Sequence, residues 1–140
     1  MPYSDEQLSE IYDRTSGYCH ICRKKLSFQN YGRPGCKGAW EVEHSKARAN
    51  GGCDRLNNLY PACITCNRDK STTSTRAARA WYGRTKAPLS REKRRQARIG
   101  NSIATGIVGY IVGAMAGPAW PVIGAVIGAG LGYRANPDRY

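Results

Sequence analysis

The order of hydrophobic and polar positions predicts a short helix near the start of this chain. Leu8, Ile11 and Tyr12 recur at helical spacing and therefore share one face. Ser4 precedes them, and Gln7 follows Ser4 by three residues, which is the pattern of an N-terminal capping box. We expect this helix to act as a scaffold element of a small folded domain.

A Trp-Glu-Val-Glu-His stretch in the first half of the chain alternates instead, which predicts a strand. Because side chains of a strand point to opposite faces in turn, Trp40, Val42 and His44 share one face, and Glu41 and Glu43 share the other. The short helix and this strand together indicate the α+β class for this part of the chain.

Residues 99–133 follow a third pattern, because they contain no charged side chain. Glycine recurs there at every fourth position in two ladders, on either side of a Pro-Ala-Trp-Pro sequence at residues 118–121. The ladders are Gly109, Gly113 and Gly117, and then Gly124, Gly128 and Gly132. Each ladder lies on one helical face, where another backbone can approach closely. The prolines predict a break between two helical arms.

The two arms resemble the glycine-zipper hairpins of small bacterial membrane and envelope proteins. The first arm, residues 103–117, would be about 22 Å long as a helix, shorter than a hydrocarbon core of about 30 Å. Basic residues flank the hairpin at Arg94, Arg95, Arg98, Arg134 and Arg139. We expect association with membrane lipid, with both ends on the cytoplasmic side. A homo-oligomer formed through the glycine ladders, or a hairpin packed on itself, is the alternative.

The net charge of the chain indicates which kind of molecule it binds. A chain of 140 residues with a formal net charge of +12 points to a polyanion, nucleic acid first and an acidic membrane surface second. The first fifteen residues are polar and acidic, so we expect no cleavable signal peptide. A cytoplasmic or inner-membrane-associated location follows from these features.

Four of the six cysteines form two Cys-x-x-Cys pairs: Cys19, Cys22, Cys63 and Cys66. Pairs at this spacing suit tetrahedral zinc, and four thiolates leave no open position, which is typical of structural zinc. Disulfides are the rival interpretation, and metal removal under reducing conditions would separate the two. Cys36 and Cys53 are left over, either as buried thiols or close enough to bond to each other.

Residues 40–70 place the predicted strand, a double glycine, Asn-Asn-Leu and the second cysteine pair in one order, with Asn67 directly after Cys66. This order and spacing resemble the HNH endonuclease family. The ββα-metal motif of that family runs from an acidic residue and His on a strand, through a loop and Asn-Leu, to a zinc knuckle and a short helix. The resemblance covers about residues 4–83 and implies a small, treble-clef-like, zinc-stabilised nuclease domain.

The resemblance also implies roles for individual residues. His44 corresponds to the general base that activates water, and Glu43 to a ligand of a catalytic divalent ion. Asn58 corresponds to the residue that ties the loop to the hairpin and so orients His44, and Asn67 to a second ligand of the ion. Carboxylate and amide oxygens favour Mg²⁺ or Mn²⁺. Many members have Asp where Glu43 stands, so the longer side chain changes the distance to the metal.

Basic residues around these positions are expected to contact phosphates. The four candidates for nucleic-acid binding are Lys46, Arg48, Arg68 and Lys70. Residues 71–98 are also rich in Lys and Arg, with Glu92 as their single acidic residue. A helix is expected over residues 75–82 and a second one from Ser90. Three interpretations of these basic residues stay open: a solvent-exposed charged surface, a surface that binds the phosphates of nucleic acid, or a basic segment next to a membrane.

The sequence thus predicts a nuclease domain at residues 1–83, a basic linker or helix at 84–98, and an apolar hairpin at 99–140. We expect metal-dependent hydrolysis of DNA with little sequence preference, in a toxin or defence nuclease whose further partner is an immunity or delivery protein. Two alternatives stay open. One is a non-catalytic zinc-containing module that binds nucleic acid; the other is a membrane-active or oligomerising protein whose zinc domain is an adaptor.

Overall fold

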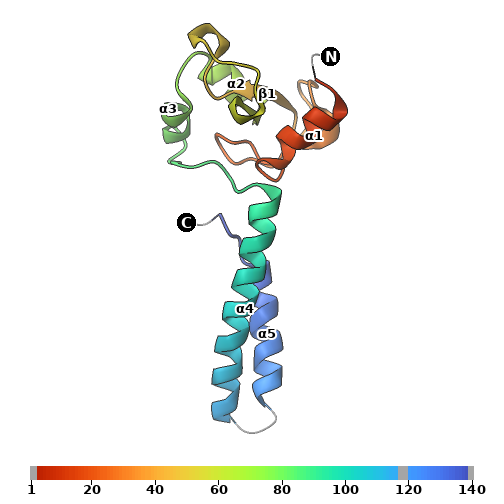
Figure 1. Ribbon diagram of the computed structural model, residues 1–140, viewed down its shortest axis with the longest axis vertical. Coiled ribbons are helices and arrows are strands. Elements are labelled where there is room, and N and C mark those ends of the chain that lie inside the picture. The colour runs from red at the N-terminus through yellow and green to blue at the C-terminus, as the bar shows by residue number, and fades with distance from the viewer. Residues whose placement is uncertain (1–2, 117–119, 139–140) are drawn as a thin grey trace. The chain divides into compact units, whose positions relative to one another are not determined.

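The computed structural model describes residues 3–116 and 120–138, which divide into two compact units, Met1–Arg91 and Glu92–Tyr140. The first unit combines helices with a two-stranded sheet, so the predicted α+β class is confirmed. Its elements are α1 (Asp5–Asp13), β1 (Trp40–His44), β2 (Leu59–Cys63), α2 (Ile64–Lys70) and α3 (Thr75–Ala80), and short 3₁₀ turns lie at Phe28–Asn30, Arg48–Asn50 and Leu56–Asn58 (Figure 1).

The predicted capping box starts α1. The backbone N–H of Gln7 donates to Oγ of Ser4 at 3.3 Å, and the backbone N–H of Ser4 donates to Oε1 of Gln7 at 3.0 Å. Leu8 and Ile11 are buried, as their shared helical face predicts. The helix is therefore fixed at its start by local hydrogen bonds and along its length by the core.

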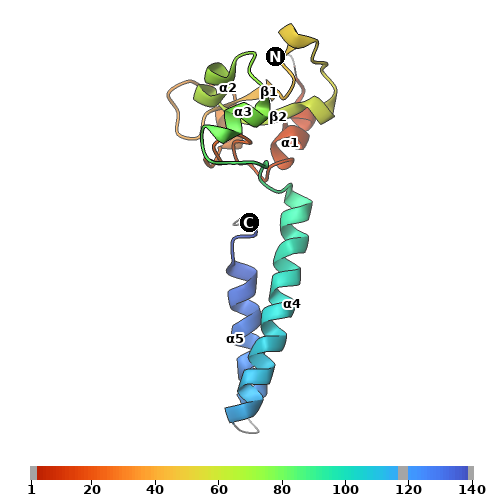
Figure 2. The same cartoon turned by 90° about the vertical axis from the view of Figure 1, so that its left-hand side faces the viewer.

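The sheet of the first unit is a single antiparallel pair. Trp40 of β1 lies opposite Cys63 of β2, and His44 lies opposite Leu59. α2 packs against both strands, and α1 packs against β2 (Figure 2). The buried apolar residues are Leu8, Ile11, Cys19, Ile21, Leu26, Trp40, Leu59, Ala62, Cys66 and Ala78. A core this small supplies limited stability, so a metal or another cross-link is expected to contribute.

The second unit is a pair of helices, α4 (Arg91–Ala116) and α5 (Trp120–Arg134). α4 runs from the basic residues that begin at Arg91 through Gly109 and Gly113 of the first ladder without a break, whereas the sequence suggested a boundary between residues 98 and 99. Glycine in a helix interior costs only about 1 kcal/mol, so Gly100 does not end it. Pro121 lies in the first turn of α5, where a missing backbone N–H leaves no intrahelical hydrogen bond unmade. Gly117 and Pro118 lie outside the described residues.

The glycine faces of α4 and α5 meet along the hairpin, where the two helices lie side by side (Figures 1 and 2). A Cβ atom added to Gly109 would stand 2.1 Å from the carbonyl oxygen of Gly124, and one added to Gly124 would stand 2.2 Å from that of Gly109. A Cβ at Gly128 would stand 2.3 Å from the carbonyl oxygen of Thr105. Only glycine permits this approach, which is typical of small-residue helix packing.

The large apolar side chains of the hairpin point outward. They include Ile103, Ile107, Val108, Tyr110, Ile111, Val112, Met115, Trp120, Val122, Ile123, Val126, Ile127, Leu131 and Tyr133, all of them exposed. Within the part of the chain that the structure describes, no helix combines the length and the apolar character needed to cross a membrane.

Two glycines of α5 provide a matched test of this packing. Gly128→Ala places a methyl group against the backbone at Thr105, whereas a Cβ at Gly130 meets no atom within 4 Å. We expect Gly128→Ala to destabilise the hairpin by about 1–3 kcal/mol and Gly130→Ala to stabilise it by up to about 1 kcal/mol. Thermal loss of helical circular dichroism in the full chain measures both effects. Equal responses of the two variants would contradict the close approach.

Candidate functional site

The two Cys-x-x-Cys pairs are brought together by different local structures. The first pair lies on a tight turn, closed by a bridge between Tyr18 and Lys25 and by a hydrogen bond from the Cys19 N–H to the Lys24 carbonyl at 2.9 Å. In the second pair, Cys63 ends β2 and Cys66 lies in α2. A hydrogen bond of 3.0 Å from the His20 N–H to the Pro61 carbonyl joins the turn to β2.

The four sulfur atoms form a cluster that fits zinc. They all lie within 4.8 Å of one another, and Sγ of Cys22 lies 3.8 Å from Sγ of Cys63. Four sulfurs at about 2.3 Å from a tetrahedral zinc ion are separated by about 3.8 Å, whereas bonded sulfurs lie about 2.05 Å apart. All six cysteines are free thiols, including the exposed Cys36 and Cys53. The disulfide interpretation is therefore replaced by a four-cysteine site compatible with structural zinc.

The end of β1 carries His44, whose side chain is 15% exposed. Its Nε2 lies 2.6 Å from Oδ1 of Asp54, and Nε of Arg48 donates to the same oxygen at 2.9 Å. Nη2 of Arg48 lies 2.7 Å from that oxygen as well. The hydrogen bonds from His44 and then Arg48 hold the pKa of Asp54 below its ordinary value, so this carboxylate stays ionised at neutral pH.

Asn58 fixes the loop that follows His44. Its Oδ1 accepts from the Lys46 N–H at 2.7 Å, and its Nδ2 donates to the carbonyls of Lys46 at 3.0 Å and Cys53 at 2.9 Å. The double glycine lets the loop close, because a Cβ at Gly52 would stand 1.8 Å from the Lys46 carbonyl oxygen. The structure thus places Asn58 where it holds both ends of the loop beside His44.

Glu43 lies inside the domain, with only 2% of its side chain exposed. Its Oε1 lies 2.7 Å from Nζ of Lys70, and its Oε2 lies 2.7 Å from Nε2 of His20, a close contact poorly aligned for a hydrogen bond. Lys70 also donates to the His44 carbonyl at 3.1 Å. Nε of Arg79 donates to the backbone carbonyl of His20 at 2.9 Å, and Nη2 of Arg79 lies 3.1 Å from Nδ1 of the His20 ring. This network joins the turn that carries Cys19 and Cys22 to the end of β1.

The carboxylate of Glu43 is paired within the core with the ammonium group of Lys70. Burial raises the pKa of Glu43, but His20 and Lys70 outweigh burial and hold this pKa below its ordinary value. Burial lowers the pKa of His20 in spite of Glu43, which keeps the imidazole neutral. The ionised carboxylate therefore adds to stability at neutral pH, and this contribution is lost as acid protonates it.

The burial of Lys70 changes its predicted role. Only 1% of its side chain is exposed, so its ammonium group is not presented to a nucleic acid. Its sequence position suggested a surface cation, yet Glu43 draws it inward, because a buried carboxylate needs a partner of opposite charge. Lys46, Arg48 and Arg68 remain exposed.

The two predicted ligands of a catalytic ion do not contact each other. Nδ2 of Asn67 donates to Oε2 of Glu41 at 2.8 Å, and Nη2 of Arg68 lies 3.9 Å from Oε1 of Glu41. Both oxygens of Glu43 contact the cation of Lys70 or the ring of His20. In this arrangement Glu43 and Asn67 do not offer a joint site to a divalent ion, and the ligand role of Glu43 stays a prediction.

Asp54 and Glu41 are the site residues that the sequence did not single out as such. The one available signal for Asp54 was that it is the only acidic residue between Ser45 and Asn58. Its contact with His44 depends on how the loop folds back, which spacing does not reveal. Glu41 was recognised only as a strand residue, because the family pattern draws attention to the carboxylate next to His44.

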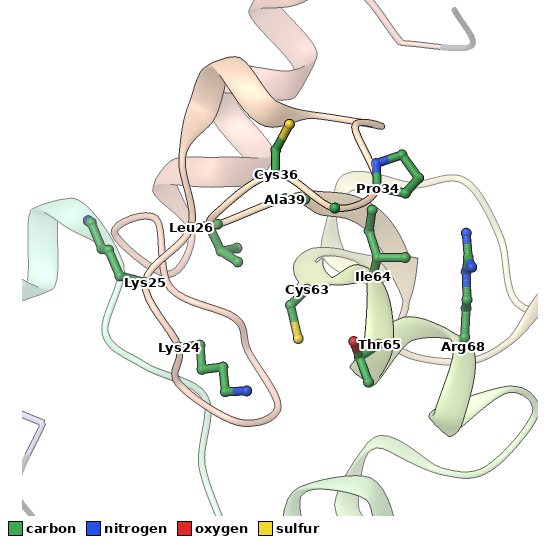
Figure 3. A pocket seen from close by; sticks show the side chains of 12 residues that line it. Lys24, Lys25, Leu26, Pro34, Cys36, Ala39, Cys63, Ile64, Thr65 and Arg68 are labelled. Carbon is green, nitrogen blue, oxygen red and sulfur yellow. The ribbon is translucent and has the colours of Figure 1, made fainter.

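A cavity of about 450 Å³ lies beside Cys63 of the four-cysteine cluster, between the turn that follows Cys22, the loop around Cys36 and α2 (Figure 3). Lys24, Lys25 and Arg68 are among its lining residues, and none of the lining residues is acidic. A phosphate is therefore favoured over a cation at this surface.

The comparisons with known proteins bear on this same region. Residues 19–73 match the family model described as HNH endonuclease. Searches of curated proteins and of solved structures gave no match. The matched span includes all four clustered cysteines together with His44, Asn58 and Asn67. Residues 19–73 are thus similar to the HNH endonuclease family, and this region has a cysteine cluster compatible with zinc.

Proposed function

We propose that the HNH domain at residues 19–73 is a catalytic nuclease that hydrolyses phosphodiester bonds of DNA with a divalent metal ion. The observation that carries the proposal is the placement of His44. Within the family match, its imidazole stands at the end of β1, partly exposed and hydrogen-bonded to Asp54. A hydrolase needs a positioned base to take a proton from water, and histidine is the side chain best suited to that task near neutral pH.

The surrounding charge supports a nucleic-acid substrate. The chain has a net charge of +12, and Lys46, Arg48 and Arg68 are exposed in the same unit as His44. Cations of this kind contact phosphates and carry no base information by themselves. We therefore propose cleavage of DNA with little sequence preference.

The proposed ion is Mg²⁺ or Mn²⁺, which would stabilise the charge that develops on the phosphate. Asn67 offers an amide oxygen, and two carboxylates are candidates to act with it. Glu43 is the family position but contacts Lys70 and His20, whereas Glu41 already contacts Asn67.

Cleavage of a supercoiled plasmid by the full 140-residue chain tests this function. We expect nicked and linear products with Mg²⁺ or Mn²⁺, and none when the zinc-loaded chain is assayed without added divalent ion. A linear duplex and a structured RNA of equal length report the preferred substrate. A folded, zinc-loaded chain that leaves every substrate intact with every metal would remove the proposal.

One observation favours a second candidate. Glu43 has both oxygens engaged in the core, as it would in a domain that keeps the HNH fold without catalysis. A non-catalytic zinc-containing module that binds nucleic acid is thus the alternative. It predicts DNA binding that weakens steeply with salt, together with no cleavage under any of the conditions above.

We propose further that the hairpin of α4 and α5 associates with lipid and locates the nuclease at the inner membrane. Its exposed apolar side chains and the basic residues Arg95, Arg98 and Arg134 near its ends support this location, because anionic headgroups attract basic side chains next to an apolar segment. A role as a toxin or defence nuclease, with an immunity or delivery protein as partner, extends the same proposal.

Sedimentation with vesicles of phosphatidylglycerol and phosphatidylethanolamine tests the location. We expect the full chain to sediment with them at high salt, since apolar contact is not screened, and Ile111→Asp to stay in the supernatant. A full chain that stays in solution as a defined oligomer would instead support self-association through the hairpin.

A further inference from the structure

We propose that Asp54 is a positioning residue for His44, which fixes the imidazole in the tautomer that leaves Nδ1 free to accept a proton from water. The inference rests on the proposed nuclease function and assigns that reaction a residue outside the family pattern. It is carried by three side chains that meet at one oxygen atom: His44, Arg48 and Asp54.

The distances decide where the imidazole proton lies. Nε2 of His44 is 2.6 Å from Oδ1 of Asp54, a distance at which a lone pair facing a carboxylate would be strongly repelled. Nε of Arg48 lies 3.2 Å from Nε2 of His44 but 2.9 Å from Oδ1, so its single proton goes to the closer and charged acceptor. Nε2 therefore carries the proton and donates it to Asp54.

With the proton on Nε2, the lone pair of Nδ1 is available to accept a proton from water. Nδ1 of His44 has no hydrogen-bond partner within residues 3–116 and 120–138, and the side chain is partly exposed. In hydrolysis the oxygen of water bonds to phosphorus, and its proton passes to Nδ1. The phosphorus–oxygen bond to the leaving group breaks, and that oxygen takes a proton from solvent. The imidazolium formed on the way is stabilised by the Asp54 carboxylate across the 2.6 Å contact.

Arg48 has a supporting part in this arrangement. It contacts Asp54 through two nitrogens, which holds the carboxylate toward His44 and offsets part of its charge. Asp54 is 59% exposed, so its replacement removes the contact without opening a cavity in the core. This makes Asp54→Ala a variant whose effects can be read without loss of the fold.

The experiment combines kinetics with ¹⁵N spectra of histidine-labelled full chain in mild detergent. The chain contains two histidines, so His44→Gln assigns the spectrum, and His20 serves as the internal reference. We expect wild type to show a protonated Nε2 and an unprotonated Nδ1 at His44. Asp54→Ala should mix the two tautomers and lower kcat by about 10- to 100-fold without raising KM, part of the effect of a general base. Asp69→Asn, an exposed carboxylate of α2, is the charge-matched control and should change neither measurement.

The tautomer and the kcat of Asp54→Ala separate the positioning role of Asp54 from the nuclease function itself. An unchanged tautomer in Asp54→Ala, or an unchanged kcat, would overturn the positioning role while leaving the nuclease intact. A wild-type chain with the expected tautomer but no cleavage would remove the nuclease function itself, and with it any catalytic part for Asp54.

Discussion

Removal of zinc is expected to unfold the domain that carries His44, even though the apolar hairpin stays helical. Structural zinc binds with an apparent free energy of about 10–16 kcal/mol at neutral pH, which is comparable to the whole stability of a domain at about 5–15 kcal/mol. The small core around Trp40 and Ile11 does not offset such a loss. Titration with a strong zinc chelator under reducing conditions, followed by tryptophan fluorescence and circular dichroism, measures the effect.

Single cysteine variants separate zinc loss from thiol loss. Cys63→Ser removes a ligand at the end of β2 and should reproduce the unfolding seen with chelator. Cys36→Ser and Cys53→Ser remove exposed thiols outside the cluster and should keep one zinc per chain by elemental analysis. A domain that keeps its near-ultraviolet spectrum without metal, or a Cys63→Ser chain that keeps its zinc, would contradict the role of the cluster.

Replacement of His44 by Ala is expected to lower the rate of plasmid cleavage by about 10²- to 10⁴-fold, the range that a general base contributes. The fold should survive, because His44 stands at the end of β1 with its ring partly exposed and makes its contacts with the surface residues Arg48 and Asp54. The measurement is the single-turnover rate of nicking at saturating divalent ion.

DNA affinity by fluorescence anisotropy is the control for this variant, since loss of a base should change the rate and leave binding within about twofold. Zinc content and thermal unfolding complete the comparison. A His44→Ala chain that nicks at the wild-type rate would transfer the base role to another group. A parallel loss of binding would show instead that the ring supports the DNA surface.

Local patterns predicted much of the first unit. The capping box at Ser4, the alternation that ends at His44 and the paired cysteine spacings each act over a few residues, and the structure has each feature at the predicted place. Such features depend on hydrogen bonds and pleat geometry between near neighbours in sequence, which is why periodicity and spacing reveal them.

The surroundings of Glu43 could not be predicted from local patterns, because they are formed by residues distant in the sequence. Alternation correctly put Glu43 on the face opposite Val42, but α2 covers that face and brings Lys70 against it. His20 comes from the first knuckle, more than twenty residues away in the chain. Whether a strand carboxylate faces a metal, water or a buried cation is thus decided by elements that no local pattern contains.

The long helix α4 continues through a change in composition. Composition changes abruptly from basic to apolar near Ile99, and this change suggested a boundary between two segments. The backbone does not respond to side-chain polarity, and no proline interrupts residues 91–116, so hydrogen bonding continues through the change. A change from basic to apolar composition along the chain therefore does not mark the end of a helix.

The hairpin has glycine between its helices and isoleucine and valine on its outer surface. Because the helices meet backbone to backbone, van der Waals contact at short range attracts them to each other, and this attraction operates in water and in lipid alike. The internal geometry of this unit is therefore nearly independent of the medium around it. Transfer between media changes the free energy of its outer surface alone, and the same two-helix shape can exist in both without refolding.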